Sequence, residues 1–462
     1  MGNFYPTSRG WRNYPSLVPY AESALASTCF GAFTAVLPGG SVVIVAGTAD
    51  DLHIYAGGTW TAQGLASAVT SGRWRFDQYG ALIIAGNGAD TFAYNGTGTF
   101  AALAGSPPNA AIVQASDYAL FLIQLNSPTW WASLSATIWT PSIATQTVTD
   151  NLDETPGNIT AAHKLRGAMT LFKNKSFSYS QFTGPPLYWD FNTVSSQIGA
   201  PCQEAVANLG DILYWPGNDD FYSFDSYSLA RVPNNLKSWF FDNIDGAHMN
   251  KIAARWDQTR SLVFWHFPSR QASPAGTLDS WICLNIRTGK WGCSRDLTYG
   301  PVPIDIPIFT PIQTGSLTYD SLTTLYPTYG DFDGLLYGDL QSQSNEVSGA
   351  IPVTGKLLSL YNGVASPGMI TTHDLGDHYH MWECSRVKPR FETYPANGDA
   401  DVTVLNQRKP GTAPVTGINQ ELSEDGFFNI RNTARMQRFK MAFRDEVEIT
   451  GFDADVEFAG DA

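Results

Sequence analysis

The chain has 462 residues, of which 15% are charged and 13% aromatic, with 42 glycines and 27 prolines. This length allows two or three domains, and many turn-forming residues with few charges predict an all-β protein and exclude a helical bundle or a disordered chain. The formal charge of −14, from 28 basic and 42 acidic residues, excludes a protein that coats or regulates nucleic acid, because phosphate contacts need a basic footprint.

The first 25 residues are predicted to form an extended N-terminal arm. They contain the segment GWRNYPSLVPY, in which Trp11, Arg12 and Tyr14 precede the first strand-like run. Aromatic side chains on an arm that cannot bury them locally commonly pack against a neighbouring molecule. We therefore predict that these three residues form an interface.

Beyond the arm, one pattern recurs through residues 26–341. A short apolar strand, a tight turn and a second strand lead to an aromatic residue, as in the turn at 86–88 that precedes Phe100. Six such units lie at 41–60, 81–100, 119–139, 168–189, 212–224 and 261–291, with a weaker trace at 330–337. Their spacing of roughly 40–50 residues is typical of the four-stranded blades of a β-propeller. We predict six or seven blades with inserted loops.

The densest aromatic stretch is NKSFSYSQFTGPPLYWDF, at 174–191. It fits a carbohydrate-binding face, a nucleic-acid stacking platform or the packed interior of a repeated β-unit. A single blade cannot bury both of its faces, so packing one blade on the next hides such rings. We therefore predict that Phe177, Tyr179 and Trp189, together with Trp291 in the sixth unit, lie at the seams between blades.

Three segments depart from the repeat. Residues 234–243, NNLKSWFFDN, place Leu236, Trp239 and Phe240 on one face of a predicted short helix. The proline-rich segment 296–325 is predicted to be a long loop. A polar linker at 341–348 precedes alternating strands, which predict an antiparallel β-sandwich over 342–462.

The five cysteines are odd in number and scattered, at Cys29, Cys202, Cys283, Cys293 and Cys384, and no CxxC is present. We expect them to be reduced and mostly buried. No charged-then-apolar leader is apparent, and the apolar runs are too short to span a bilayer. We therefore expect a protein that folds in the cytosol and is not inserted in a membrane.

The best metal candidate is the run from His373 to His380, where His378 and His380 would share one face of a strand. Surface histidines in a turn are the simpler interpretation, and we predict neither a metal nor a cofactor. The sequence has no GxSxG, P-loop, GxGxxG, HExxH or aspartate-box repeat, and no spacing pairs its carboxylates as a glycosidase requires. We expect no catalytic residues.

Two segments together resemble a known family. LRGAMTLFKNKSFSYSQFTGPPLYWDF (165–191) and QEAVANLGDILYWPGNDDFYSFD (203–225) are similar to the nozzle proteins of short-tailed bacteriophages, also called tail-hub or packaged-DNA stabilisation proteins. The helix predicted at 234–243 and the closing RMQRFKMAFRDEVEITGFDADVEF (435–458) match further elements of that family. The likeness covers 165–340 and the last strands, and the first 160 residues match only as generic blades.

The resemblance implies a structural protein of the virion tail that forms a ring, as a homohexamer, below the portal and adaptor. The ring would hold fibres, spikes or a needle, and its lumen would conduct the genome DNA without specific binding. Fixed carboxylates near phosphates repel them, so DNA is not retained. The stretches without Lys or Arg, at 77–163 and 296–354, are our candidates for the lumen surface.

Two other classes of function stay open. A glycan-binding or glycan-hydrolysing β-propeller would stack its aromatic rings on sugars. A monomeric scaffold would bind protein partners without forming a ring.

Overall fold

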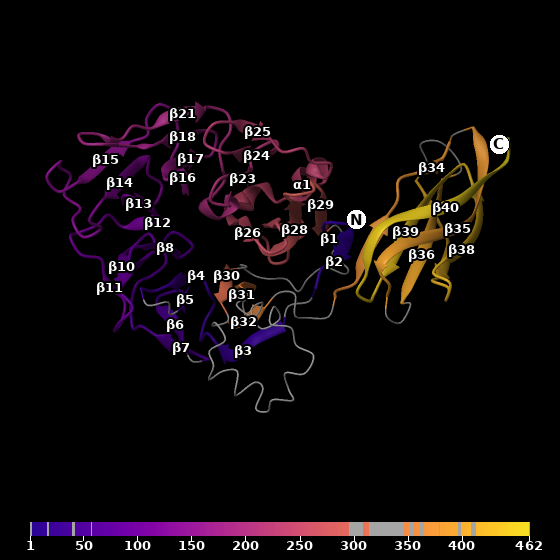
Figure 1. The fold of residues 1–462 in the computed structure, drawn as a ribbon, viewed down its shortest axis with the longest axis horizontal. Helices are drawn as coiled ribbons and strands as arrows, with labels where there is room; N and C mark the ends of the chain where they lie inside the picture. The colour runs from indigo at the N-terminus through magenta and orange to yellow at the C-terminus, as the bar shows by residue number, and fades with distance from the viewer. Residues whose placement is uncertain are drawn as a thin grey trace, which may run out of the picture. The chain divides into compact units, whose positions relative to one another are not determined.

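The computed structural model describes residues 2–15, 18–38, 42–56, 58–294, 308–313, 346–351, 355–359, 365–377, 379–395, 399–407 and 413–461. It is almost entirely antiparallel β-structure, with one short α-helix, α1 (Lys237–Asn243), in the described part (Figure 1). The chain divides into two compact units. Unit 1 comprises Met1–Leu17, Val232–Asp305 and Tyr361–Ala462, and unit 2 comprises Val18–Arg231 and Ile306–Leu360.

Unit 2 contains five consecutive four-stranded sheets, and in each sheet the strands pair in chain order. Their strands are β4 (Gly31–Val36), β5 (Val42–Gly47), β6 (Leu52–Ala56) and β7 (Thr59–Ala62); β8 (Arg75–Tyr79), β9 (Leu82–Gly86), β10 (Thr91–Tyr94) and β11 (Ala101–Ala102); β12 (Ala110–Ala115), β13 (Leu120–Gln124), β14 (Thr129–Ser133) and β15 (Thr147–Asn151); β16 (Ile159–Leu165), β17 (Ala168–Lys173), β18 (Phe177–Ser180) and β21 (Asn192–Ser195); and β22 (Ala207–Asn208), β23 (Leu213–Pro216), β24 (Phe221–Phe224) and β25 (Leu229–Arg231).

The sixth sheet of unit 2 joins segments that are far apart in the sequence. Strand β3 (Val18–Ala24) pairs with β32 (Lys356–Ser359), and β31 (Glu346–Ile351) and β30 (Ile308–Gln313) complete the sheet. The first and last segments of unit 2 are therefore hydrogen-bonded to each other. The buried residue Ile351 packs in one cluster with Leu25 and Ile44 of the neighbouring sheet.

The five consecutive sheets of unit 2 follow one another round an arc, with β4, β8, β12 and β16 on its inner side (Figure 1). Strand β4 contacts β8, β8 contacts β12, β12 contacts β16, and β16 contacts β22. Apolar clusters fill the space between successive sheets because each short sheet has two apolar faces. Close packing is visible at Gly47, where a Cβ atom would lie 2.2 Å from the Trp74 ring.

Unit 1 is built round one 14-stranded sheet. A continuous path runs β26-β27-β28-β29-β1-β2-β40-β35-β38, and β33, β34, β36, β37 and β39 branch from it. Their bounds are β1 (Gly2–Pro6), β2 (Trp11–Asn13), β26 (Ala253–Asp257), β27 (Leu262–Pro268), β28 (Leu278–Asn285), β29 (Trp291–Ser294), β33 (Gly368–Thr371), β34 (Leu375–Gly376), β35 (His380–Thr393), β36 (Ala400–Gln407), β37 (Val415–Glu421), β38 (Phe428–Ala434), β39 (Met436–Phe443) and β40 (Glu448–Asp461).

The C-terminal strands of unit 1 enclose their own core. Alternation is clearest in β39, where Phe439, Met441 and Phe443 are buried and the residues between them are partly exposed. Val402 of β36 and Phe428 of β38 meet them in the same cluster. This period of two is what a half-buried strand requires.

The N-terminal segment is not the extended arm that the sequence predicts. Strand β1 pairs with β29 and β2 pairs with β40, so both lie inside the sheet of unit 1. Tyr14 is 1% exposed and packs against Phe264 and Trp281. The segment differs from the prediction because its backbone forms hydrogen bonds with strands more than 280 residues away in the sequence.

The unit boundaries differ from the predicted divisions at 25 and 341. Residues of the sixth predicted repeat, β26 to β29, belong with the C-terminal strands because β1 and β2 connect them through one sheet. Helix α1 begins at Lys237, three residues later than predicted, since Asn234 instead accepts a hydrogen bond from Leu236 N in the preceding turn.

The aromatic residues predicted to pack between blades lie in buried clusters. Phe177 is 0% exposed and contacts Trp215 and Phe224 of the next sheet, and Tyr179 contacts the same Phe224. Trp189, on the hairpin of β19 (Phe182–Gly184) and β20 (Tyr188–Trp189), packs edge-to-face on Phe121 of β13.

Trp291 has a different environment from the other three. It stacks on Trp265 within its own sheet, and its indole Nε1 donates to the Pro233 carbonyl oxygen at 2.7 Å. Four sequence predictions lie wholly or mostly outside the described residues: the loop at 296–325, the weak repeat at 330–337, the linker at 341–348 and the lumen stretch at 296–354.

Candidate functional site

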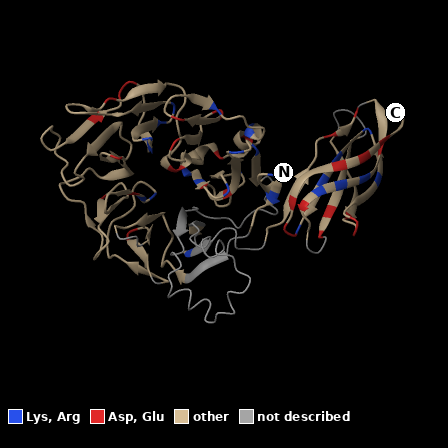
Figure 2. Cartoon of the chain, in the orientation of Figure 1, with Lys and Arg blue, Asp and Glu red and all other residues tan. Residues whose placement is uncertain are grey.

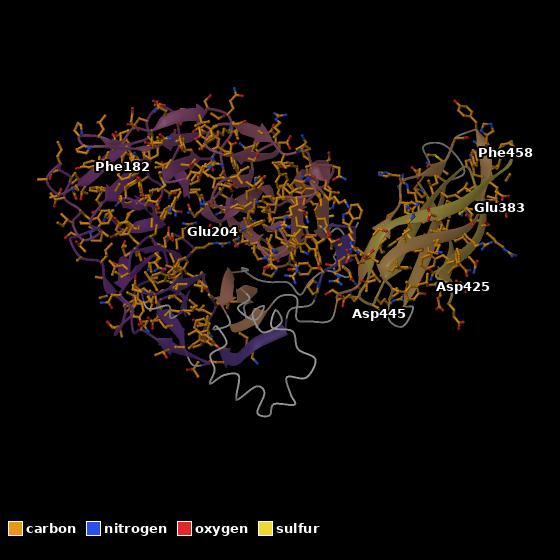
Figure 3. All side chains as sticks on the ribbon, viewed as in Figure 1. Phe182, Glu204, Glu383, Asp425, Asp445 and Phe458 are labelled. Carbon is orange, nitrogen blue, oxygen red and sulfur yellow. The ribbon has the colours of Figure 1, made fainter. Side chains whose placement is uncertain are left out.

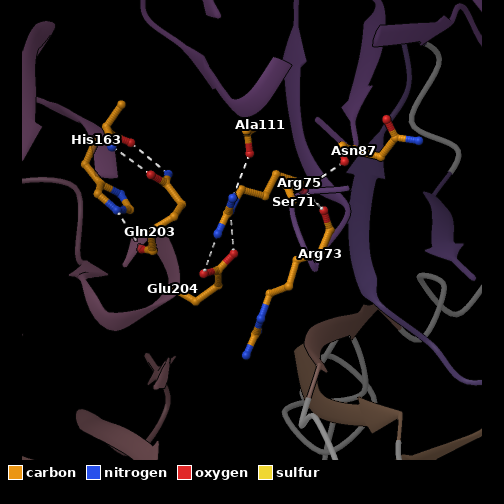
Figure 4. Close-up of polar contacts among 9 residues, drawn as sticks. Ser71, Arg73, Arg75, Asn87, Ala111, His163, Gln203 and Glu204 are labelled. Carbon is orange, nitrogen blue, oxygen red and sulfur yellow. Dashed lines mark hydrogen bonds and ion pairs between the residues drawn. The ribbon is translucent and has the colours of Figure 1, made fainter. Parts of the chain in front are cut away.

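The first strands of the sheets in unit 2 bring charged side chains together on the inner side of the arc. We call this cluster the polar centre, and it consists of Arg75, Asp77, His163, Lys164, Gln203 and Glu204. Figure 3 shows where Glu204 lies, and Figure 4 shows the contacts of Arg75, His163, Gln203 and Glu204. Arg75 and Asp77 lie on β8, His163 and Lys164 on β16, and the 3-10 helix η1 (Gln203–Ala205) precedes β22.

A bidentate ion pair joins Arg75 to Glu204. Arg75 Nε donates to Glu204 Oε1 at 2.7 Å and Nη2 donates to Oε2 at 3.1 Å, while Nη1 donates to the Ala111 carbonyl oxygen at 2.7 Å (Figure 4). Burial alone would raise the pKa of Glu204, but the positive charges of Arg75 and Arg73 lower it to about 2. The pair therefore stays charged and connects two sheets that are not neighbours in the chain.

Gln203 and His163 join η1 to β16. The Gln203 amide accepts from Ala162 N at 2.7 Å and donates to the Ala162 carbonyl oxygen at 2.8 Å, which reproduces the pairing of a neighbouring strand. His163 Nε2 lies 3.0 Å from the Gln203 carbonyl oxygen, so this nitrogen carries the proton. Burial lowers the pKa of His163 to about 4, and the ring is neutral at pH 7.

Asp77 fixes the end of β12. Its Oδ2 accepts from Gln114 Nε2 and from Ala115 N, both at 2.6 Å, and its Oδ1 accepts from Gln78 N at 2.7 Å. Burial raises the pKa of Asp77 to about 6, although these hydrogen bonds and the charge of Lys164 act in the opposite direction. The carboxyl group is therefore poised to gain a proton under mildly acidic conditions.

A cavity of about 780 Å³ opens beside the polar centre. It is lined by Asp77 and Gln114, by the ion pair of Lys164 with Asp117, and by Asn208 of β22. Carboxylate, amide and ammonium groups from four sheets thus face one space. Such an arrangement suits the binding of a small polar molecule.

The run from His373 to His380, the best metal candidate in the sequence, contains residues that form ion pairs. Asp374 pairs with Arg438, and Asp377 accepts from the His380 ring at 2.9 Å and from His380 N at 2.7 Å. His378 lies outside the described residues. Within the described ranges, no group of three or more His, Cys, Asp or Glu side chains could hold a metal ion.

The five cysteines are all buried thiols. Burial raises the pKa of Cys29 and of Cys202 to about 12, so neither thiol ionises near neutral pH. In the part of the chain that the structure describes, no helix has the length and apolar character needed to cross a membrane.

Sequence patterns do not predict the polar centre. One signal was present: Arg75 and Lys164 are the two basic residues that bound the long stretch without Lys or Arg. Isolated charges at the ends of apolar strands predict a shared site only when the strands are known to be adjacent. That adjacency depends on how the sheets pack, which single-sequence patterns do not contain.

The comparisons with known proteins show no family. No family model matches the chain, and no curated protein matches it. Among solved structures, the extracellular domain of a protein described as a one component system, BT4673 from B. thetaiotaomicron, is similar with a TM-score of 0.43 and 7% sequence identity. The match covers 83% of this chain and 44% of that chain.

Proposed function

We propose that this chain is a structural subunit of the tail nozzle of a short-tailed bacteriophage and not an enzyme. The observation that carries the proposal is the family resemblance of three segments, 165–191, 203–225 and 435–458. They correspond to β17–β20, to η1 with β22–β24, and to β39–β40. The resemblance thus covers parts of both units.

We also propose that the repeated sheets form a β-propeller of six or seven blades. Consecutive four-stranded sheets with adjacent first strands support this architecture. A further support is the sheet of β3, β32, β31 and β30, which unites the first and last segments of unit 2, as closure of a ring of blades requires.

A role in resisting mechanical force would explain the continuous sheet of unit 1. Nine strands follow one another without a break from β26 to β38, so backbone hydrogen bonds run through the whole path. Basic and acidic residues are interspersed on its C-terminal strands (Figure 2). Arg386 of β35 pairs with Asp455 of β40, and Arg390 pairs with Asp453. A frame of this kind suits a component that connects a portal and adaptor to fibres, spikes or a needle.

The genome conduit in this proposal is the lumen of a ring of subunits, a homohexamer. It is not the middle of a single unit 2, because Glu204 lies on the inner side of the arc (Figure 3), where it pairs with Arg75 (Figure 4). The acidic balance of the chain, 42 acidic against 28 basic residues, keeps DNA from adhering as it passes.

Electron microscopy of phage particles tests the proposal. Gold-labelled antibodies raised against the full chain should mark the tail vertex of particles whose genome encodes it, and mass photometry should detect ring-sized assemblies of the purified chain. Labelling of the capsid shell only, or absence of the chain from purified particles, would overturn the assignment. Turnover of a glycan substrate by the purified chain would instead favour a glycan-hydrolysing propeller.

A further inference from the structure

The cavity beside the polar centre has the size of a small-molecule site. Its volume of about 780 Å³ lies within the range in which proteins bind ligands of a few hundred daltons. Four sheets contribute to it, through β8, β12, β16 and β22, the turns after β8 and β12, the start of β9 and a residue after β14. The lining residues are Asp77, Gln78, Tyr79, Gly80, Ala81, Leu82, Gln114, Ala115, Ser116, Asp117, Ser135, Lys164 and Asn208.

The lining favours a polar ligand without negative charge. Its aliphatic side chains are Ala81, Leu82 and Ala115, which form too small a surface for an apolar molecule. Asp77 and Asp117 outnumber the single ammonium group of Lys164, so a phosphorylated or carboxylated ligand meets net repulsion.

Lys164 and Asp117 present a donor and an acceptor side by side. Their ion pair joins Lys164 Nζ to Asp117 Oδ1, and the two side chains are 39% and 51% exposed. An ammonium group has three N–H donors and a carboxylate has two acceptor oxygens. The pair therefore keeps N–H donors and Oδ2 available to a molecule in the cavity.

The groups behind this pair are held in place before any ligand arrives. Asn208 Nδ2 donates to the Lys164 carbonyl oxygen at 2.7 Å, and Ser116 Oγ accepts from Ala119 N at 2.9 Å. Gln114 Nε2 donates to Asp77 Oδ2, which fixes the orientation of the Gln114 amide. The Gln114 Oε1 acceptor therefore points away from Asp77. A site arranged in advance loses less entropy on binding.

We propose that this cavity binds a neutral mono- or disaccharide. Adjacent hydroxyl groups of a sugar ring are each both donor and acceptor, so one hydroxyl donates to Asp117 Oδ2 while its neighbour accepts from Lys164 Nζ. The Gln114 amide and the Asn208 amide lie in the same lining for the remaining hydroxyl groups. The inference stands on the cavity alone and does not depend on the nozzle proposal.

Calorimetric titration of the full chain tests the site with glucose, galactose, mannose, N-acetylglucosamine and maltose, and with glucose 6-phosphate as the anionic comparison. We expect at least one neutral sugar to bind and glucose 6-phosphate to bind more weakly than glucose. Asp117→Ala and Lys164→Met should each weaken the binding about tenfold or more, the value of a charge-assisted hydrogen bond.

Asp219→Asn is the matched control, because Asp219 forms an exposed ion pair with Arg231 elsewhere in unit 2. This variant should bind the sugar as the wild type does, and thermal unfolding should show that all three variants are folded. Absence of binding by every neutral sugar overturns the inference. It is equally overturned if glucose 6-phosphate binds more tightly than glucose, or if both cavity variants keep wild-type affinity.

Discussion

Asp77 and His163 lie in the same polar centre, and burial shifts the pKa of each in the direction that favours its uncharged form. The pKa of Asp77 is raised to about 6 and that of His163 is lowered to about 4. Glu204, also buried, behaves differently because two arginines face it and its pKa falls to about 2. At the scale of single residues, a buried carboxyl group here has a low pKa only where guanidinium groups compensate for the lost water.

We expect Asp77 and His163 to have opposite effects on the way the free energy of unfolding changes with pH. The folded state raises the pKa of Asp77 above its ordinary value of 3.8. Asp77 therefore contributes most to the free energy of unfolding below pH 3.8, and this contribution is lost as the pH rises through 6. His163 contributes above its ordinary value of 6.5, and this contribution is lost as the pH falls toward 4. Each effect amounts to about 3 kcal/mol.

Asp77→Asn separates the two effects, since it removes only the first. Between pH 7 and pH 4 the free energy of unfolding of this variant should fall relative to wild type by about 2 kcal/mol, measured by urea unfolding. Asp219→Asn, at an exposed ion pair, should follow the wild-type curve. If the free energy of unfolding changed with pH in the same way for Asp77→Asn and wild type, the Asp77 carboxyl group would have its ordinary pKa in the folded protein.

Glu204→Gln should destabilise the protein strongly. The substitution leaves the Arg75 guanidinium charged and buried without its carboxylate, and loss of one partner of a buried pair costs about 3–5 kcal/mol. Chemical denaturation at pH 7 measures the change. As a control, Arg75→Met with Glu204→Leu removes both charges and should recover part of the loss. A double variant less stable than the single one would contradict this explanation.

At the scale of strands, aromatic side chains join each sheet to its neighbours or to the chain around it. Phe177 and Tyr179 project from β18 onto Phe224 of the following sheet. Trp189 packs on Phe121, while Trp291 stays within its own sheet and bonds to Pro233. The regular alternation in short strands therefore predicts burial well, but it does not state which neighbour each ring contacts.

Trp189→Ala and Trp291→Ala should each lower the free energy of unfolding by about 3–5 kcal/mol, because each deletes a large buried side chain. The two indoles are 3% and 5% exposed. Thermal or urea unfolding of the purified variants gives the comparison. Tyr227→Ala, at a ring that is 82% exposed, should have a small effect, and an equal loss in all three variants would argue against specific packing.

At the scale of the whole molecule, the two ends of the chain are parts of one sheet. Strand β2 pairs with β40 and β1 pairs with β29, so the N-terminal residues connect the strands of 253–294 with those after 365. Asn13 strengthens this connection, since its side chain donates to the carbonyl oxygens of Ser366 and Asp445. Unit 1 thus depends on its N-terminus for continuity.

Deletion of residues 1–15 should therefore unfold or loosen unit 1 and leave the sheets of unit 2 protected. The deletion removes Phe4, which is 0% exposed, together with the buried Tyr14 ring. Hydrogen–deuterium exchange followed by mass spectrometry reports both units at once. We expect faster exchange in β29 and β40 and unchanged exchange in β13 and β17. Unchanged protection of β29 and β40 would mean that these strands hold together without β1 and β2.

The intact protein should bind duplex DNA weakly or not at all. Its formal charge of −14 opposes contact with phosphates, and this repulsion grows as salt is removed. A gel-shift or anisotropy titration at low ionic strength measures the binding. Tight binding that weakens with added salt would contradict passage of the genome without retention.

The sequence by itself determined the local structure of this protein. Short apolar runs with turns between them predict the strands of unit 2, and the alternation around Phe439 predicts those of the C-terminal core, because strand formation depends on a period of two between nearby residues. Strand β35 runs without a break from His380 to Thr393, although its pairing with β40 shifts register around Ser385.

The tertiary structure alone decided where these strands meet. The place of β1 and β2 beside β29 and β40, the sheet that joins β3 to β32, and the polar centre at Arg75 and Glu204 all depend on contacts between residues far apart in the chain. Pairing of distant strand edges and compensation of buried charges are set by packing in three dimensions, and the order of residues along the chain carries no direct record of either.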